Sequence, residues 1–277
     1  MCQYLILFIS TRNTNNVAPF YSHNRKLQLF ENSTEASNSV ADYIIEKINK
    51  FKPTERKPFV IGLPTGSSPE KVYARLVEQY KNGKVDFTNV VSFNMDEYYG
   101  LEATHPQSYH YFMYHHLFNH VNFKPENINI LNGLASDWEK ECQDYEAKIK
   151  KYGRIHLFLG GLGPEGHIAF NEAGSPRNSI TRKVTLVEST IKANSRFFNN
   201  DLSKVPKFAL SVGISTVIDN SDEIIIVVYG KGKRYALRKT VSSPETADFP
   251  STYLQDHPHT TIYSDFEAIE GFEKSKL

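Results

Sequence analysis

A glycine-rich stretch, residues 160–172 (GGLGPEGHIAFNE), holds the side chains best suited to acid–base chemistry. His167 stands between two carboxylates, Glu165 and Glu172, and the stretch follows an apolar run of strand type, 155–159. Histidine exchanges protons near neutral pH, and flanking carboxylates can fix its tautomer and raise its basicity. The alternative is an ordinary turn after a strand with charged residues on a solvated rim. The stretch alone does not decide between these interpretations.

A second informative stretch follows the apolar run 59–63 and consists of Thr65, Gly66, Ser67 and Ser68. A strand that turns through small hydroxyl residues into a helix directs free backbone N–H groups, and the positive end of the helix dipole, at one point. A phosphate group would fit there. Ordinary capping, with Ser68 as the N-cap of the next helix, explains the residues equally well. The stretch matches neither the GxxxxGK[ST] nor the GxGxxG nucleotide motif.

Three more charged residues are candidates for the same site. Asp96 ends the strand candidate 90–95, and open α/β sheets keep reactive groups at such strand ends, although Asp96 could also cap the next segment. Arg196 lies between polar and aromatic neighbours, where it is either a surface residue or a bidentate phosphate clamp. Lys233 follows the clearest strand candidate, 224–228.

These residues need elements that bring them together. Strand patterns alternate with helical patterns over the whole chain, which predicts a single α/β domain with a doubly wound, mostly parallel, Rossmann-like sheet and helices on both faces. In such sheets ligands bind beyond the carboxyl ends of the strands, so the loops TGSS, MDEY, GGLGPEGH and GKGK are expected to converge on one rim. The strands are expected at 27–30, 59–63, 90–95, 155–159, 224–228 and 260–263. Helix N-caps are expected at Ser33 or Thr34, at Ser68 and at Ser136, the last in a capping box with Glu139, and a further helix is expected from Arg234 to Val241.

The convergence favours a functional site over four unrelated turns. The side chains expected at this site suit a small phosphorylated metabolite that undergoes proton transfer. The hydroxyl-rich turn 65–68 and the cations would hold the phosphate, while Asp96 and His167 would move protons. Nothing predicts a serine nucleophile, because no GxSxG elbow is present. The helical segment 106–120 contains four histidines, but without HExxH or a comparable ligand set they are interpreted as surface residues and no metal is expected.

Composition narrows the class of protein. The 32 basic and 31 acidic residues among 277 nearly balance, so nothing predicts nucleic-acid or membrane binding. Two cysteines, Cys2 and Cys142, cannot form a disulfide framework, which favours a reducing compartment, the cytoplasm. Residues 1–25 are expected to form a poorly ordered extension, since their apolar run 4–9 is too short to span a bilayer. The domain is then 26–277.

Six motifs, in chain order, resemble the glucosamine-6-phosphate deaminase (isomerising) family, most closely its fungal branch: LPTGSSP, FNMDEY, SYHYFM, GGLGPEGHIAFNE, ANSRFF and KVPKFALSVGIST. The resemblance runs from about Lys26 to the C-terminus. It implies conversion of glucosamine 6-phosphate and water to fructose 6-phosphate and ammonia in the catabolism of amino sugars such as N-acetylglucosamine. It also implies that no cofactor is required.

The resemblance assigns roles to matching residues. His167 would assist opening of the pyranose ring, and Asp96 would shuttle a proton between C2 and C1 through an enolamine. Glu172 would tune and orient His167, and Glu165 would be a further catalytic residue. The phosphate would be bound by Thr65, Gly66, Ser67, Ser68, Arg196 and Lys233.

The chain departs from the bacterial pattern of this family at several positions. Glu165 replaces the aspartate found in many members, and its extra methylene alters the reach of the carboxylate. Pro176 and Val184 occupy positions that match an effector-binding serine and lysine, which argues against activation by N-acetylglucosamine 6-phosphate and leaves the oligomeric state open. The segment 242–253, near the active-site lid in the bacterial pattern, also differs.

Two alternative functions remain at this point. A 6-phosphogluconolactonase would share the fold and a related glycine–histidine loop, but lactone hydrolysis does not need the proton shuttle that Asp96 offers. An inactive sugar-phosphate sensor would bind the ligand without turnover and would carry a DNA-binding or partner segment. The N-terminal extension is too short and too weakly basic for a helix-turn-helix domain.

Overall fold

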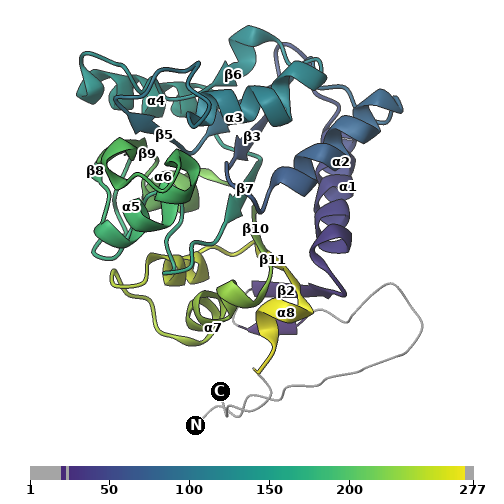
Figure 1. The fold of residues 1–277 in the computed structure, drawn as a ribbon. Helices are drawn as coiled ribbons and strands as arrows, with labels where there is room; N and C mark the ends of the chain where they lie inside the picture. The colour runs from purple at the N-terminus through teal and green to yellow at the C-terminus, as the bar shows by residue number, and fades with distance from the viewer. Residues whose placement is uncertain (1–19, 23–24, 272–277) are drawn as a thin grey trace.

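The computed structural model describes residues 20–22 and 25–271 (Figure 1). The extension expected over residues 1–25 therefore lies mostly outside the described residues. Within it, the backbone of β1 (Phe20–Ser22) pairs antiparallel with β2 (Arg25–Phe30). None of the helices in the described part of the chain is long and apolar enough to cross a membrane.

The main sheet has eight strands in the order β1-β2-β11-β10-β7-β3-β4-β6. Every pairing in it is parallel except that of β1 with β2. This arrangement confirms the predicted doubly wound sheet. Its remaining strands are β3 (Phe59–Leu63), β4 (Val90–Asn94), β6 (Ile128–Asn129), β7 (Leu157–Gly161), β10 (Ile224–Val228) and β11 (Thr260–Asp265).

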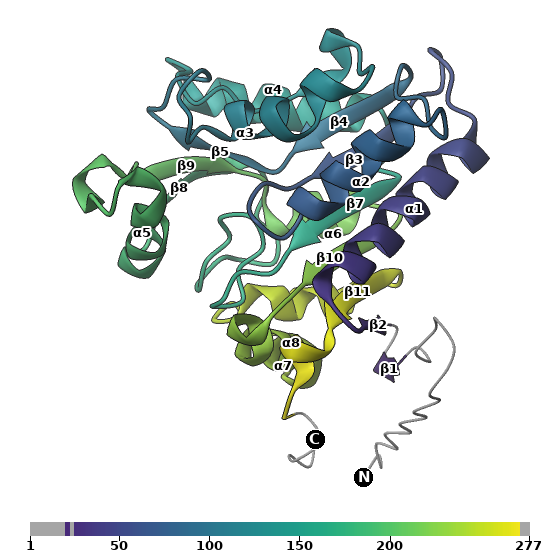
Figure 2. The ribbon, with the colours of Figure 1, turned by 45° about the vertical axis from the view of Figure 1, so that its right-hand side comes forward.

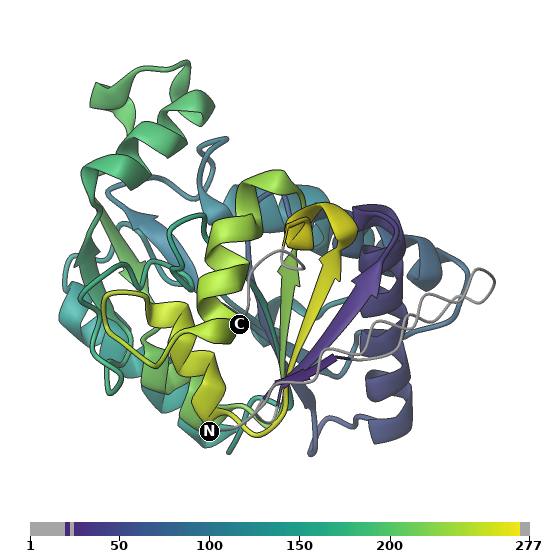
Figure 3. The same cartoon turned by 90° about the horizontal axis from the view of Figure 1, so that it is seen from below.

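Helices cover both faces of this sheet, as Figure 3 shows for α1 and α7. Alternate residues of each strand therefore enter different cores: Val60 of β3 packs with α4, α6, α7 and α8, whereas Phe59 and Ile61 pack with α1, α2 and α3. The helices are α1 (Ser33–Phe51), α2 (Glu70–Lys81), α3 (Tyr109–His116), α4 (Trp138–Lys151), α6 (Ile214–Asn220), α7 (Arg234–Ser242) and α8 (Phe266–Ile269). Short 3-10 helices are η1 (Phe118–His120), η2 (Pro125–Asn127), η3 (Ser195–Phe198), η4 (Leu202–Lys204), η5 (Lys231–Lys233) and η6 (Pro250–Asp256).

A second sheet, which the sequence pattern did not predict, has three antiparallel strands in the order β5-β9-β8. It contains β5 (Asp96–Tyr99), β9 (Phe208–Ser211) and β8 (Arg182–Thr185), and it carries α5 (Glu188–Asn194) at one side of the molecule (Figure 2). Asp96 therefore begins a strand of this second sheet rather than a loop. Strands of four residues paired across large sequence separations leave little periodic signal, which is why they were missed.

Three predicted helix caps are wrong by one residue. Asn32 caps α1, accepting hydrogen bonds from the N–H groups of Thr34 and Glu35, and Asp137 rather than Ser136 caps α4. The first residue of α2 is Glu70, its N-cap is Pro69, and no side chain caps it, so Ser68 lies in the preceding turn. Adjacent hydroxyl and carboxamide side chains compete for a cap, and backbone geometry selects among them.

The order of strands creates a switch point between β3 and β7. These strands are neighbours, with Ile61 opposite Leu157 and Gly62 opposite Phe158. From β3 the chain proceeds through β4 to β6 at one edge, and from β7 it proceeds through β10 to β11 in the other direction. The loops that follow β3 and β7 therefore diverge, and open α/β sheets bind ligands in the crevice between such loops.

Candidate active site

The four predicted loops do meet at one edge of the main sheet. Leu63 at the end of β3 is level with Asn94 at the end of β4, and Gly161 at the end of β7 is level with Val227 of β10. Because these strands are parallel, the segments that follow them leave the sheet on the same side. The convergence expected from the alternating pattern is confirmed.

Glycines let the loop after β7 close around the imidazole of His167. The Gly163 N–H donates to the His167 carbonyl at 3.0 Å, and the Gly166 N–H donates to the Gly163 carbonyl at 3.0 Å. A Cβ on Gly163 would lie 2.1 Å from Nε2 of His167, and a Cβ on Gly166 would lie 2.1 Å from the ring of Phe249. Glycine is therefore required at 163 and 166 by the close approach of His167 and Phe249, and not only by the turn itself.

The imidazole of His167 is neutral at physiological pH. Burial and, to a smaller extent, the positive charge of Lys233 lower its pKa to about 4, and the charge of Glu165 opposes both effects. The expectation that flanking carboxylates raise its basicity is therefore outweighed by burial. A neutral imidazole can both accept and donate a proton through its two nitrogens.

Both carboxylates that flank His167 in the sequence have partners in the segment around α5. Glu165 Oε2 accepts a hydrogen bond from the Ser189 hydroxyl at 2.8 Å. The buried Glu172 accepts from the Thr190 hydroxyl and from the Val187 N–H, the latter at 3.0 Å. Since both oxygens of Glu172 are engaged there, its expected role in orienting His167 stays a prediction.

Asp96 is 6 % exposed and lies at the start of β5, opposite Ser211. Burial, together with the neighbouring charge of Glu97, raises the pKa of Asp96 well above its ordinary value. A raised pKa makes the carboxylate a stronger base, which suits a group that takes a proton and returns it. The proton shuttle expected of Asp96 stays a prediction.

Glu97 is a residue whose role the sequence analysis missed. Its buried carboxylate accepts hydrogen bonds from the N–H groups of Tyr98, Tyr109 and His110, at 2.8, 2.9 and 2.8 Å, and so holds the first turn of α3. Burial raises its pKa to about 7 in spite of these donors. Ser108 is the N-cap of α3, and Glu97 adds acceptors for two further N–H groups at the start of this helix, so the capping role considered for Asp96 is filled by other residues.

The two cations predicted to bind phosphate come together. The Lys233 ammonium donates to the Leu162 carbonyl at 2.5 Å, at the start of the His167 loop. Burial, followed by the charge of Arg196, lowers the pKa of Lys233 to about 8. Arg196 is exposed, and its guanidinium lies over the ring of Phe197. Two cations that are close enough to perturb one another suit a doubly charged ligand.

The cradle residues Thr65, Gly66, Ser67 and Ser68 form the turn between β3 and α2. Gly66 has a φ of 103°, a conformation that favours glycine. Among the described residues, the N–H groups of this turn have no hydrogen-bond acceptor. Backbone donors left free at the start of a helix can bind an anion. The described residues contain no group of three or more side chains able to hold a metal ion.

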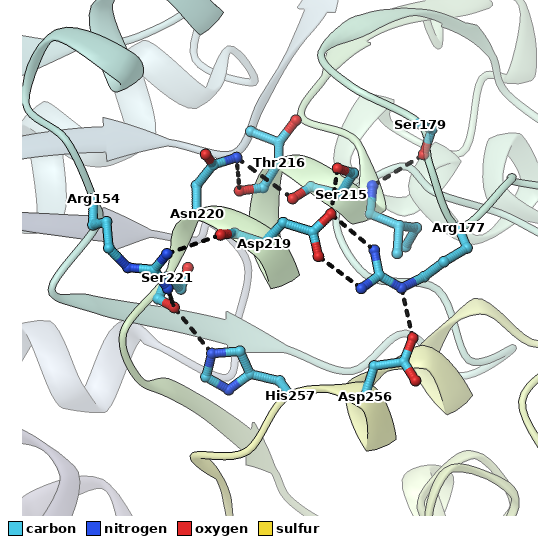
Figure 4. A network of polar contacts seen from close by, with 11 residues as sticks. Arg154, Arg177, Ser179, Ser215, Thr216, Asp219, Asn220, Ser221, Asp256 and His257 are labelled. Carbon is cyan, nitrogen blue, oxygen red and sulfur yellow. Dashed lines mark hydrogen bonds and ion pairs between the residues drawn. The ribbon is translucent and has the colours of Figure 1, made fainter.

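Arg177 braces the loop that leaves the His167 motif (Figure 4). Its guanidinium binds Asp219 at the end of α6 through two hydrogen bonds, at 2.7 and 3.2 Å, and Asp256 of η6 at 2.7 Å. The η6 segment in turn contacts the motif, because the Ser251 N–H donates to the Gly166 carbonyl at 2.9 Å. Arg177 therefore connects the segment that follows the motif to the ends of α6 and η6, at the edge of the main sheet where β10 and β11 begin and opposite the candidate site.

Replacing Arg177 with methionine should lower the melting temperature by about 2 to 4 °C, the effect of roughly 1 kcal/mol in a domain of this size. The three partly exposed hydrogen bonds act as a network, which is why a measurable effect is expected. Differential scanning calorimetry at low and high salt measures it. Lys140→Met, which removes an exposed pair with Asp144, is the matched control and should shift the midpoint less. Equal shifts of the melting temperature in both variants would contradict a stabilising role for the Arg177 network.

Fold and site together define a class. A doubly wound sheet that gathers two cations, a buried aspartate and a neutral imidazole at its switch point is typical of α/β enzymes that act on small anionic metabolites. The chain belongs to the family described as glucosamine-6-phosphate isomerases/6-phosphogluconolactonase, whose model matches residues 31–263. The resemblance seen in the motifs is confirmed.

Individual relatives agree with this assignment. The chain is 62% identical over 250 residues to a glucosamine-6-phosphate isomerase of Candida albicans, covering 90% of this chain and 98% of the relative. It is 52% identical over 230 residues to a glucosamine-6-phosphate deaminase of Pasteurella multocida, covering 83% and 86%.

Solved structures show the same fold. That of a monomeric glucosamine-6-phosphate deaminase superposes with a TM-score of 0.83 at 36% identity, covering 87% of this chain and 98% of that one. A 6-phosphogluconolactonase from Leishmania guyanensis gives 0.67 at 20% identity, covering 88% and 97%, and this likeness concerns the fold alone.

Proposed function

We propose that the protein is a glucosamine-6-phosphate deaminase that converts glucosamine 6-phosphate and water to fructose 6-phosphate and ammonia in amino-sugar catabolism. The observation that carries this proposal is that Asp96, whose pKa is raised, His167, whose pKa is lowered, and Lys233 all follow strands that end at the same edge of the main sheet. This arrangement occurs in a chain that is 62% identical, over nearly its whole length, to a glucosamine-6-phosphate isomerase.

The proposed reaction begins with ring opening. His167 accepts the proton of the anomeric hydroxyl and returns it to the ring oxygen, a transfer for which a neutral imidazole is suited. The ionised Asp96 then removes the proton from C2, while the aldehyde oxygen takes a proton from the substrate ammonium group, which gives an enolamine. Asp96 passes its proton on to C1 and is ionised again, which leaves a C2 iminium. Water adds to the resulting C2 iminium, and ammonia leaves as the ketone forms.

In this proposal the phosphate fixes the sugar relative to the two proton carriers. Free N–H groups and hydroxyls of the turn between β3 and α2 bind it from one side, and Arg196 and Lys233 bind it from the other. Anchoring the end of the substrate that does not react reduces the entropy lost at the reacting carbons. The proposed steps are proton transfers and hydrolysis, so we propose no cofactor and no metal.

The binding of this phosphate should weaken at alkaline pH. The lowered pKa of Lys233, about 8, means that its positive charge is lost as pH rises through that value in the free enzyme. The value of kcat/KM should therefore fall above about pH 8, mainly through a rise in KM. Steady-state kinetics from pH 6.5 to 9.5 measure this. In Lys233→Arg the decline should move to higher pH; an unchanged decline would show that another group causes it.

Regulation by N-acetylglucosamine 6-phosphate is not expected. Pro176 and Val184 replace effector-binding residue types, and Arg182 donates to Asn171 at 2.8 Å and to Ser175 at 3.2 Å instead of facing solvent freely. We propose an enzyme of the cytoplasm that needs no effector and no nucleic acid or membrane partner. Turnover with and without N-acetylglucosamine 6-phosphate, run beside a measurement of molecular size, tests the regulation and defines the oligomeric state.

The competing functions are separated by one assay. The purified protein is incubated with glucosamine 6-phosphate or with 6-phosphogluconolactone, and ammonia, fructose 6-phosphate and lactone hydrolysis are followed. Release of ammonia with fructose 6-phosphate supports the deaminase. Turnover of the lactone alone would make the protein a lactonase, and binding of the sugar phosphate without turnover would make it a sensor.

A further inference from the structure

Side chains of one short segment hold both carboxylates that flank His167. The Ser189 hydroxyl binds Glu165 at 2.8 Å, and the Thr190 hydroxyl binds Glu172, whose other oxygen accepts the Val187 N–H. Ser189 and Thr190 are consecutive residues in the first turn of α5. Because neighbouring helical residues point about 100° apart, their hydroxyls can reach two different carboxylates.

The contact between Glu172 and Thr190 is buried, so its loss is expected to be costly. Glu172 is 9 % exposed and Thr190 is 7 % exposed, so a lost hydrogen bond could not be replaced freely by solvent. A hydrogen bond to a buried charged group contributes more than one between neutral groups, and leaving the charge without its donor costs more still. The orientation of Glu172 therefore depends on the Thr190 hydroxyl.

Glu165 depends on α5 in a different way. It is exposed, it is one methylene longer than aspartate, and the charge of its carboxylate raises the pKa of His167 against the effect of burial. Its contact with Ser189 turns one oxygen toward α5. The distance and direction of this charge relative to the imidazole are thus set by a residue outside the motif.

We propose, on the basis of the deaminase function above, that Ser189 and Thr190 are positioning residues: their hydroxyls orient Glu165 and Glu172 and so set the arrangement around His167 that ring opening and proton transfer require. They touch the carboxylates and not the reacting atoms. The same segment continues directly into η3, which carries Arg196. It therefore joins the phosphate-binding part of the site to the proton-transfer part.

Steady-state kinetics of Thr190→Val test this inference. Valine keeps the shape of threonine without the hydroxyl, so kcat should fall by about tenfold, as expected when a buried charged group loses its donor. KM should change less than about twofold, because the phosphate ligands are untouched. Thr190→Ser should restore most of kcat, and Ser189→Ala should lower kcat by a smaller factor, since Glu165 is exposed. Thr185→Val is the matched control, because Thr185 is exposed in β8, and it should leave both constants unchanged.

If Thr190 only stabilised the fold of α5, the same kinetic measurements would give a different result. If loss of the hydroxyl only loosened α5, Arg196 would move with it, and KM would rise while kcat stayed near the wild-type value. That outcome, or a Thr190→Val variant with wild-type kcat, would overturn the positioning role while leaving the deaminase function intact. Wild-type protein that releases no ammonia would overturn the proposed function and this inference together.

Discussion

Replacing Asp96 with asparagine is expected to lower kcat for deamination of glucosamine 6-phosphate by about 10²- to 10⁴-fold, the usual contribution of a general acid–base group. The substitution keeps the size of the side chain and removes only its ability to carry a proton. Burial and the charge of Glu97 raise the pKa of Asp96, so its carboxylate is a stronger base toward the C2 proton, which it can then pass to C1. The amide cannot.

Binding separates this role from a structural one. The variant should bind glucosamine 6-phosphate with nearly wild-type affinity in isothermal titration calorimetry, since Arg196, Lys233 and the turn between β3 and α2 are unchanged. Asp144→Asn, which alters an exposed carboxylate paired with Lys140, is the control and should retain full activity. Undiminished turnover in Asp96→Asn would remove this residue from the mechanism.

Gly163→Ala should lower kcat/KM by about 10²-fold or more. The added Cβ would lie 2.1 to 2.3 Å from Nε2, Cε1 and Cδ2 of His167, so the imidazole would have to leave its position. A displacement of about 1 Å of a reacting group can cost a factor of about 10² in rate. Rate measurements on the purified variant, with circular dichroism to establish that it is folded, check the expectation.

The same loop offers a matched control. Gly161→Ala adds an identical methyl group two residues earlier, where a Cβ has no neighbour within 4 Å. It should therefore have close to wild-type kcat/KM. If both glycine variants lost activity equally, the cause would be loop flexibility rather than the position of His167. If neither lost activity, the close approach to His167 would have no role in catalysis.

Much of the main sheet could be predicted because its signals are local. The strands β3 and β10 were predicted with the bounds they have, since continuous apolar runs bordered by turn residues are typical of strands buried on both faces. Alternation with helical patterns then implied a parallel sheet and one common rim. The N-caps of helices were predicted less accurately than the strands: Asp137 caps α4, whereas Ser136 was predicted to do so.

The second sheet and the functions of Glu97 and Arg177 could not be predicted. The buried Glu97 accepts hydrogen bonds from two N–H groups at the start of α3, and Arg177 binds Asp219 and Asp256 from far along the chain. Contacts of this kind depend on which segments the fold places side by side. No periodicity or motif encodes them, so sequence patterns identify the residue and leave its partner open.

The sequence by itself determined the fold class and the family, because the alternation of strand and helix patterns and the motifs are local features of the chain. Only the tertiary structure decided the electrostatic states of the site residues. Burial lowers the pKa of His167 and raises that of Asp96, and both effects depend on the surrounding packing rather than on neighbours in sequence. The structure likewise decided that Glu165 and Glu172 are held from α5, since hydrogen bonds between distant segments exist only once the chain has folded.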